Sequence, residues 1–585
     1  MFKKRFTVIL ICIFCITTLV VSCGQTSQTA STTTTAESTT QTTSNTTTTT
    51  QSTAKESNDT DSDNLPAGSL VTENGAMPVV TEPYVITVLE AHNSPTMPFA
   101  DNRFTTWYEE QSGVKLDFKY SLGSDFNEKF NAIMASGDYP EMFIKAGWLG
   151  SNAQIIDLGH QGLVQPIEDY IDNYSVHLKS LMKEKTFLRD NVSDPDTGHM
   201  YGLPGAEEYA AHRVWSKLFV YKPWLEKMSI DYPVTTDDFE QMLIAFKEND
   251  PNGNGTQDEV PLAFDGSNLG NWAPLISPFV YWDNGNYLEN NKDSKLSFNA
   301  NSEGFRNAIR WLHHLYEQGL FSDDIFTGVD LRMLGENTEP ILGVSIGHYM
   351  GVFTLAGDLT SNRFREYDML TPLTGPTGER YATYALYDAN YRVVLTDKMK
   401  NPEVAVRWAD WFYTVEGTIC GMWGLKGEAW DDPPEQGFGL TGFPYIWNML
   451  KQTTENELVD YAWQWSSPHF RSREINEGVY MSDEVAPFDY DMRTQAQAVE
   501  AYEKKGVYTP EKAYPKFVID AENNQRLSDL RTPMATFINA TFADMVLGNQ
   551  NVETDWEAYC AELDAMGWEE YLSIYQELLD KFNNN

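Results

Sequence analysis

The chain has 585 residues, of which 41% are hydrophobic and 13% aromatic, enough to fill the cores of two or three domains. Its 84 acidic and 42 basic residues give a formal net charge of −42. Nucleic acids and anionic lipid surfaces are bound by clustered Lys and Arg, so this charge argues against both as partners and leaves carboxylates free to hold a hard cation.

The N-terminal segment carries the sharpest local signal. Basic residues at positions 3–5 precede an apolar run over 6–21, and Ser22 and Cys23 follow. The run is short for a membrane span and ends at a small residue, which predicts a secretory signal peptide over residues 1–22. The letters L-V-V-S-C at its end resemble the bacterial lipobox, which implies cleavage before Cys23 and lipidation of its thiol. We therefore expect a lipid-anchored protein on the extracytoplasmic face of the cell membrane; an uncleaved transmembrane anchor is the alternative.

A tether is predicted after the lipidated cysteine, over residues 23–78. Thr, Ser and Gln dominate residues 25–65, which include no aromatic residue. Such a composition cannot bury enough apolar surface to offset the entropy lost on ordering, so we expect disorder. A flexible chain of this length reaches on the order of 40 Å.

The body of the chain begins with alternating strands and helices. Strands are predicted over 84–89, 114–118 and 139–144, and amphipathic helices over 104–113 and 126–136. This β-α-β-α-β order favours a largely parallel sheet with helices on both faces. Further helices are predicted over 236–247, 305–318, 402–415, 529–547, 555–566 and 568–582. The helix over 555–566 is expected to begin with a capping box formed by Thr554 and Glu557.

Five segments match a known family in order and spacing. They are F-T-T-W-Y-E-E-Q-S-G-V-K-L (104–116), S-G-D-Y-P-E-M-F (136–143), H-M-Y-G-L-P (199–204), Y-E-Q-G-L-F (316–321) and D-W-E-A-Y (555–559). Together they resemble the extracellular solute-binding proteins of ABC importers, in the sugar-binding branch that includes alginate-binding and oligosaccharide-binding lipoproteins.

The resemblance implies an α/β, two-lobed periplasmic-binding-protein-like fold of type II, with a ligand cleft between hinged lobes. Lobe one is expected over 79–205 and 385–440, and lobe two over 206–384 and 441–585. The implied function is to capture an oligosaccharide and deliver it, as a monomer and without catalysis, to ABC permease subunits. The alternatives are an oligopeptide-binding lipoprotein and a secreted polysaccharide-degrading enzyme, although no GxSxG or HExxH motif occurs.

Residues 250–259, D-P-N-G-N-G-T-Q-D-E, carry the strongest chemical signal. Oxygen-bearing side chains at positions 1, 3 and 5 and a glycine at position 6 match the first half of an EF-hand loop. Position 12 is Pro261, so closure falls to other carboxylates. The segment is similar to the calcium loop of alginate-binding relatives, which implies a structural Ca²⁺ held by Asp250, Asn252, Asn254, Asp258, Glu259 and the Thr256 carbonyl. The alternative is a polar turn without metal.

The ligand site is predicted from aromatic and cationic residues in loops. Sugar rings stack on aromatic faces, and sugar hydroxyls need fixed donors and acceptors. The residue Trp148 follows the strand that ends at 144, at the carboxyl end of the predicted sheet, where open α/β sheets bind ligands. The candidate ligand-binding residues are Lys145, Trp148, Arg213, Trp215, Trp272, Tyr349 and Trp430. Core packing is the alternative for each aromatic residue, and both neutral and uronic sugars stay open.

Two cysteines belong to the predicted body, Cys420 and Cys560. Two cysteines do not make a disulfide framework in a chain of this size. We expect free thiols, with a single disulfide as the alternative.

Overall fold

The structure is a computed structural model that describes residues 69–92, 96–123, 126–145, 151–283, 285–355, 361–439, 441–451, 458–480, 487–504 and 510–584. The predicted signal peptide, Cys23 and the tether up to residue 68 lie outside these residues. Part of the remaining tether contacts the body, because Val71 is 1% exposed and pairs with Val80 in an antiparallel bridge, whereas Met77 is 40% exposed. Within the described part of the chain, no helix combines the length and apolarity needed to cross a membrane.

A six-stranded sheet forms the first layer, with strand order β14-β4-β11-β3-β1-β2. Strands β1, β2 and β3 run parallel, and β11 is antiparallel to both β3 and β4. The strands are β1 (Tyr84–Ala91), β2 (Val114–Leu122), β3 (Met142–Ile144), β4 (Leu203–Glu207), β11 (Ala389–Leu395) and β14 (Phe470–Arg471). The predicted β-α-β-α-β beginning of the body is confirmed.

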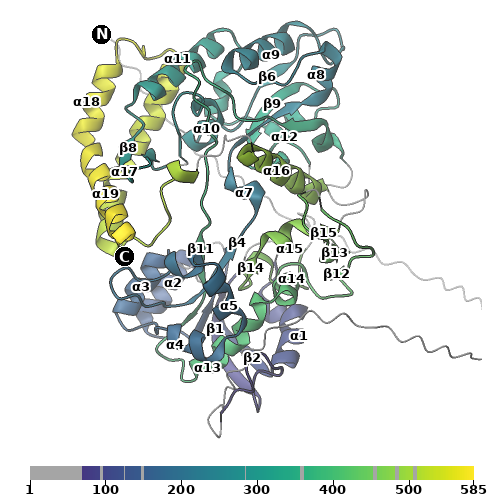
Figure 1. Cartoon of the computed structure of the whole chain (residues 1–585), viewed down its shortest axis with the longest axis vertical. Coiled ribbons are helices and arrows are strands. Elements are labelled where there is room, and N and C mark those ends of the chain that lie inside the picture. Colours follow the sequence, from purple (N-terminus) through teal and green to yellow (C-terminus); the bar gives the residue numbers. More distant parts are fainter. Residues whose placement is uncertain are drawn as a thin grey trace, which may run out of the picture. The chain divides into compact units, whose positions relative to one another are not determined.

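Helices flank this sheet on both sides (Figure 1). Helix α1 (Arg103–Ser112) begins where the Asn102 side chain accepts the N–H of Phe104 and ends at Gly113, whose φ of 74° lies in the left-handed region. The other helices around the first sheet are α2 (Phe126–Ser136), α3 (Asn152–His160), α4 (Glu168–Tyr174), α5 (His177–Glu184), α6 (Phe187–Asp190), α13 (Pro402–Asp410), α14 (Val415–Trp423) and α15 (Arg473–Glu477).

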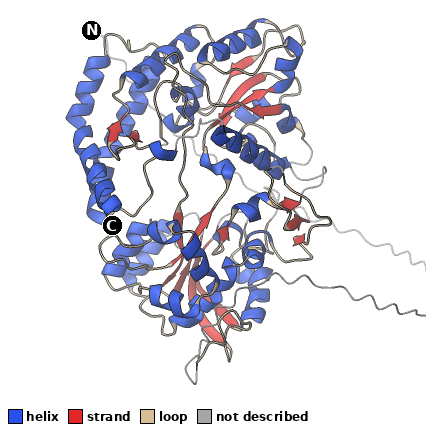
Figure 2. Ribbon diagram, viewed as in Figure 1, coloured by secondary structure: helices blue, strands red, loops and turns tan. Residues whose placement is uncertain are grey.

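A second, four-stranded sheet has the strand order β10-β5-β9-β6 and its own helices (Figure 2). Its strands are β5 (Lys217–Tyr221), β6 (Val260–Leu262), β9 (Leu342–Gly347) and β10 (Tyr367–Met369). Its helices are α8 (Lys222–Met228), α9 (Thr236–Glu248), α10 (Ala273–Ile276), α11 (Glu303–Glu317), α12 (Leu331–Gly335), α17 (Ala521–Val546), α18 (Trp556–Met566) and α19 (Trp568–Asn584). The predicted capping box of α18 is wrong: Asp555 is the N-cap without a side-chain cap bond, and the Thr554 hydroxyl donates to the Asp555 carboxylate instead.

Each sheet has its own hydrophobic core. We call the parts around these cores lobe one (69–207 and 389–480) and lobe two (217–373 and 521–584). The chain passes between them at 208–216, which includes α7 (Ala210–Arg213), and at 374–388. It passes a third time after lobe one ends with β15 (Val479–Tyr480) and before lobe two resumes at residue 521, a stretch that includes α16 (Pro487–Lys504).

One lobe assignment from the sequence needs correction. Residues 441–480 were expected in lobe two, but Trp447, Trp463 and Val479 are buried in the first core. The ring of Trp463 stacks on Phe99 with centroids 4.3 Å apart, so the large indole is part of the packing of lobe one. Two strands of this stretch, β13 (Trp447–Met449) and β15, form a small sheet with β12 (Trp430–Asp431).

Candidate functional site

The predicted metal loop folds around the carboxylate of Asp250. This carboxylate accepts the main-chain N–H groups of Gly253 (2.8 Å), Asn254 (3.1 Å) and Gly255 (2.9 Å). Both glycines have φ near +80°, a conformation that glycine adopts without a steric cost. From the neighbouring helix α8, the ammonium of Lys227 donates to the Pro251 carbonyl at 2.7 Å and fixes the loop from outside.

The remaining predicted ligands gather in the same loop. The side-chain amides of Asn252 and Asn254 donate to the Asp258 carboxylate at 3.0 and 3.1 Å, and the N–H of Thr256 donates to Asn254 Oδ1 at 2.7 Å. Both carboxylate oxygens of Glu259 are buried without a hydrogen-bond partner. A buried carboxylate without a partner is costly unless a cation compensates it. The donor set is therefore one that suits a hard, oxygen-binding cation.

Acidic side chains alone do not define this loop as a metal centre. In the described part of the chain, no three His, Cys, Asp or Glu side chains gather as a metal-binding group. A cation at this loop would depend on the amide oxygens of Asn252 and Asn254 and on a main-chain carbonyl as well as on carboxylates.

Two tryptophans of the described residues stand out by their exposure, Trp215 at 43% and Trp465 at 45%. The first follows α7 in the passage from lobe one to lobe two, and the second lies in the short helical turn η8 (Gln464–Ser466) of lobe one. An exposed indole offers a flat apolar face on which a ligand can stack.

On the lobe-two side, Trp215 is part of a small aromatic group. Its ring stacks on His348 with centroids 4.9 Å apart and an interplanar angle of 10°, and the His348 ring lies 4.4 Å from that of Tyr349. Burial, followed by the charges of Lys217 and His212, lowers the pKa of His348 to about 4. The imidazole is therefore neutral at pH 7 and acts as a flat support for the indole.

On the lobe-one side, backbone geometry turns Trp465 outward. Gln464 adopts a positive φ of 51°, which is unusual for a residue with a side chain. The preceding Trp463 points inward and donates its indole N–H to the Thr105 hydroxyl at 2.7 Å. Arg392, on β11, donates to the Trp465 carbonyl at 3.3 Å.

A polar network joins the two tryptophans across the first passage. At the end of β4, the carboxylate of Glu207 pairs with Arg471 at 3.0 Å and with His212 at 2.7 Å. The guanidinium of Arg471 lies over the ring of Trp465, and the ring of His212 lies 6.3 Å from that of Trp215. Burial alone would raise the pKa of Glu207, but Arg471 and His212 outweigh it and hold the pKa well below its usual range. The carboxylate is charged and fixed.

Several sequence-predicted ligand residues lie in this region. Trp215 and Tyr349 belong to the aromatic group, and Arg213 lies over the ring of Tyr387 at 4.8 Å from its centroid. Lys145 follows β3 with φ of 63°, and its side chain is buried. Burial, followed by the charge of Arg392, lowers the pKa of Lys145 to about 7. Trp148 lies outside the described residues.

Two predicted platforms are corrected by their packing. Trp272 is 0% exposed, stacks on Phe326 at 5.0 Å and donates its indole N–H to the Gly266 carbonyl at 2.9 Å. Trp430 is 5% exposed and belongs to the first core. An enclosed ring offers no face to a sugar, so neither is kept as a candidate. Cys420 and Cys560 are free thiols, as expected.

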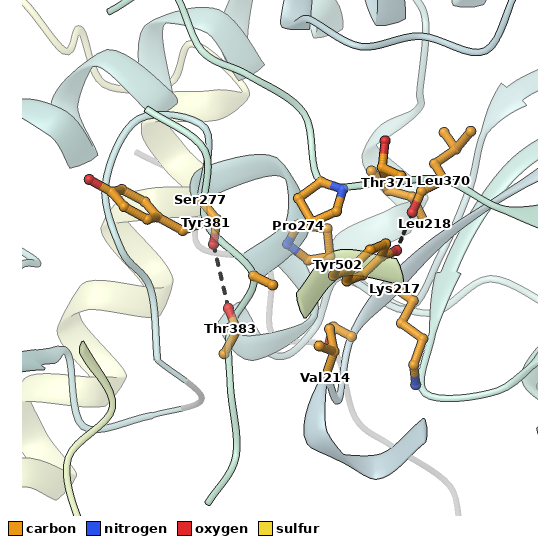
Figure 3. A pocket seen from close by; sticks show the side chains of 13 residues that line it. Val214, Lys217, Leu218, Pro274, Ser277, Leu370, Thr371, Tyr381, Thr383 and Tyr502 are labelled. Carbon is orange, nitrogen blue, oxygen red and sulfur yellow. Dashed lines mark hydrogen bonds between the residues drawn. The ribbon is translucent and has the colours of Figure 1, made fainter. Parts of the chain in front are cut away.

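A small cavity lies beside β5 (Figure 3). The hydroxyls of Ser277 and Thr383 face each other at 3.4 Å on its wall, and the Tyr502 hydroxyl donates to the Leu370 carbonyl. The side chain of Lys217 also lines it, and burial lowers the pKa of that amine to about 7. The cavity has a volume of about 20 Å³. This is room for a water molecule and far too little for a sugar ring.

Two cores joined by several chain passages, with exposed aromatic rings beside fixed polar groups, are the architecture of a type II solute-binding protein. The chain belongs to the bacterial extracellular solute-binding protein family, whose sequence pattern matches residues 90–419.

Comparison with individual proteins agrees with this assignment. The chain is 27% identical over 489 residues to FusA, a fructooligosaccharide ABC transporter substrate-binding protein of Streptococcus pneumoniae, covering 82% of this chain and 86% of FusA. It is 26% identical over 297 residues to lipoprotein LipO of Bacillus subtilis, covering 49% of this chain and 55% of LipO.

Solved structures share the fold. FusA in complex with kestose superimposes with a TM-score of 0.68 at 25% identity, over 86% of this chain and 100% of that chain. A solved structure of a FusA EF-hand mutant in complex with fructo-nystose is also similar to this chain. An HMO-binding, ABC-transporter-associated solute-binding protein of Bifidobacterium longum infantis superimposes with a TM-score of 0.71 at 19% identity, over 86% of this chain and 99% of that chain.

Proposed function

We propose that this protein captures an oligosaccharide outside the cell and delivers it, as a monomer, to the permease of an ABC transporter. The observation that carries the proposal is the pair of exposed indoles, Trp215 and Trp465, linked by a network of fixed charges and hydrogen-bonding groups. Aromatic faces suit the C–H face of a sugar, and fixed polar groups suit its hydroxyls. The similarity to FusA, a fructooligosaccharide-binding protein, supports the same ligand class.

Two cations of the network around Glu207 and Glu208 are already paired, which favours a neutral sugar. Arg471 pairs with Glu207, and Lys185 pairs with the carboxylate of Glu208 at 3.0 Å. Each of these cations already has a carboxylate partner within the protein. An anionic sugar would have to compete with these partners, whereas a neutral sugar exchanges only hydrogen bonds.

The same contacts argue against Glu207 and Glu208 as the acid pair of a glycosidase. A glycosidase needs one carboxyl group with a raised pKa as general acid. The pKa of Glu207 is instead held well below its usual range, and the adjacent Glu208 is engaged by Lys185 and not by the partners of Glu207. We therefore propose binding without catalysis.

Titration of a glycan panel tests this function. Neutral oligosaccharides, including fructooligosaccharides, are expected to bind the purified protein with micromolar or tighter affinity in calorimetry and to change its tryptophan fluorescence. Uronic oligosaccharides are expected to bind more weakly, and short peptides not at all. Peptide binding without any response to a glycan would overturn the sugar assignment. Chromatographic detection of cleaved glycan would show that the protein is a polysaccharide-degrading enzyme.

We also propose that the loop over 250–259 holds a structural Ca²⁺. The unpartnered, buried carboxylate of Glu259 supports it, together with the oxygen-bearing side chains of Asp250, Asn252, Asn254 and Asp258. Calcium prefers six to eight oxygen ligands and tolerates the mixture of carboxylate, amide and carbonyl groups that this loop offers. The existence of an EF-hand in FusA agrees with this proposal.

Lipidation of Cys23 is the proposed means of attachment to the membrane. The Cys23→Ala variant is expected to move from the membrane fraction to the soluble fraction with an unchanged melting temperature, because both hydrophobic cores of the described chain are formed by residues from Val71 onward. Fractionation followed by immunoblotting measures this. The Cys560→Ala variant, which changes a thiol of the body, serves as control and should stay with the membrane. A membrane-bound Cys23→Ala protein would contradict the proposed anchor.

A further inference from the structure

We propose that Arg471 is a positioning residue of the sugar site, whose guanidinium holds the ring of Trp465 in the pose that receives a sugar. The inference rests on the proposed function, because it assigns a role to a residue beneath one of the two exposed indoles. Arg471 itself is 5% exposed and is therefore not a surface contact.

The guanidinium of Arg471 lies over two indole rings. Its central carbon is 4.6 Å from the ring centroid of Trp465 and 5.0 Å from that of Trp423 at the end of α14. A cation within about 6 Å of an indole face is attracted by the ring quadrupole, and the attraction is stronger where water is excluded. A buried guanidinium is therefore an effective support for a half-exposed ring.

Three hydrogen bonds to described residues fix the plane of the guanidinium. Nε and Nη2 both donate to Asn476 Oδ1, at 3.0 and 2.6 Å, and Nη1 donates to Glu207 Oε2 at 3.0 Å. The Asn476 amide is itself held, because its Nδ2 donates to the carbonyls of Glu208 and Arg471 at 3.1 and 3.2 Å. The support is thus rigid before any ligand arrives, which reduces the entropy that binding has to overcome.

The indole of Trp465 depends on this support. Among the described residues, no aromatic ring stacks on the indole of Trp465, and the guanidinium of Arg471 lies over its face. Arg392 fixes the main chain of the same residue through its carbonyl. One arginine therefore holds the backbone of Trp465, and the other holds its ring.

A double-mutant cycle tests the proposal. Arg471→Lys keeps the positive charge beside Glu207 but loses the planar fork that stacks and reaches Asn476. We expect about tenfold weaker binding of a neutral oligosaccharide by Arg471→Lys, and less than about twofold further loss when the same change is made in Trp465→Ala, because coupled residues are not additive. Wild-type affinity in Arg471→Lys, or losses that simply multiply, would overturn the proposal.

The neighbouring Arg473 offers a matched control. Its guanidinium lies 4.9 Å from the ring centroid of Phe443 and pairs with Glu477 and Glu500, so it has similar chemistry without contact to Trp465. Arg473→Lys is expected to bind sugar like the wild type. If Arg471→Lys does not fold, Asn476→Ala takes its place in the cycle, because it removes the hydrogen bonds that Nε and Nη2 of the guanidinium donate to Asn476 Oδ1.

A second measurement separates this proposal from the proposed function. In protein labelled with 5-fluorotryptophan, the ¹⁹F signal of Trp465 is identified by its loss in Trp465→Phe. Arg471→Lys should shift or broaden that signal in the absence of sugar, and Arg473→Lys should not. A wild-type protein that binds no glycan would refute the proposed function alone, whereas an unchanged Trp465 signal in Arg471→Lys would refute the positioning role.

Discussion

Replacing both Trp215 and Trp465 by alanine is expected to weaken oligosaccharide binding by about 100-fold or more, because a buried aromatic contact contributes about 1–3 kcal/mol at each position. Each single variant should lose about tenfold or more by the same reasoning. Trp215 lies in the first passage between the lobes and Trp465 in lobe one, so the losses should be nearly additive if the sugar contacts both rings at once. Calorimetry with the best glycan of the panel measures the effect.

An exposed ring elsewhere provides the control. Tyr232 is 45% exposed, and its hydroxyl bonds to Asp368 on β10, not to the network around Glu207. Tyr232→Ala should bind sugar with wild-type affinity. If the Trp215 and Trp465 double variant kept full affinity, the sugar would have to bind elsewhere, and the site described here would be wrong.

Removing calcium is expected to lower the melting temperature of the wild-type protein by several degrees. A ligand that binds only the native state at about 100 times its Kd adds about 2.7 kcal/mol. In a domain of 150–250 residues, this free energy corresponds to roughly 5–10 °C. Differential scanning calorimetry in millimolar Ca²⁺ and in a chelator measures the difference. Asp250→Ala should abolish it, and Asp265→Asn, in an exposed turn outside the loop, should preserve it.

The variant Glu259→Gln gives a sharper form of the same test. It removes a buried charge that has no hydrogen-bond partner, so in a chelator it should be at least as stable as the wild type. With calcium present it should be less stable, because a carboxylate ligand is lost. An identical response of both proteins to calcium would show that Glu259 does not face the ion.

The sequence predicted the elements of lobe one better than the roles of its aromatic residues. The strand predicted over 84–89 follows from a run of aromatic and β-branched residues, a signal that is local in the sequence. Whether a loop tryptophan faces the core depends on contacts that are distant in sequence: Trp272 stacks on Phe326 and packs near Phe542. No local signal distinguishes it from Trp215.

Trp465 was missed for a related reason. Trp463 and Trp465 are two residues apart in one polar segment, and the positive φ of Gln464 is what turns one ring inward and the other outward. A glutamine gives no hint of that conformation. The sequence also did not reveal that residues 441–480 belong to lobe one. Their place depends on the packing of Trp447 and Trp463 into a core formed mainly by residues earlier in the chain.

The place of β11 in the first sheet has a consequence for how the chain acquires its structure. β11 lies between β3 and β4, and residue 393 pairs with both Ile144 and Leu203. During synthesis or refolding, the edges of β3 and β4 that pair with β11 therefore stay unpaired until residues 217–373 have been synthesised or have collapsed. Contacts between such distant residues form slowly, and exposed edges invite association with other chains. Fragments that end before residue 389 should contain lobe-one sequence without a complete lobe-one sheet, so assembly of this lobe is a late event.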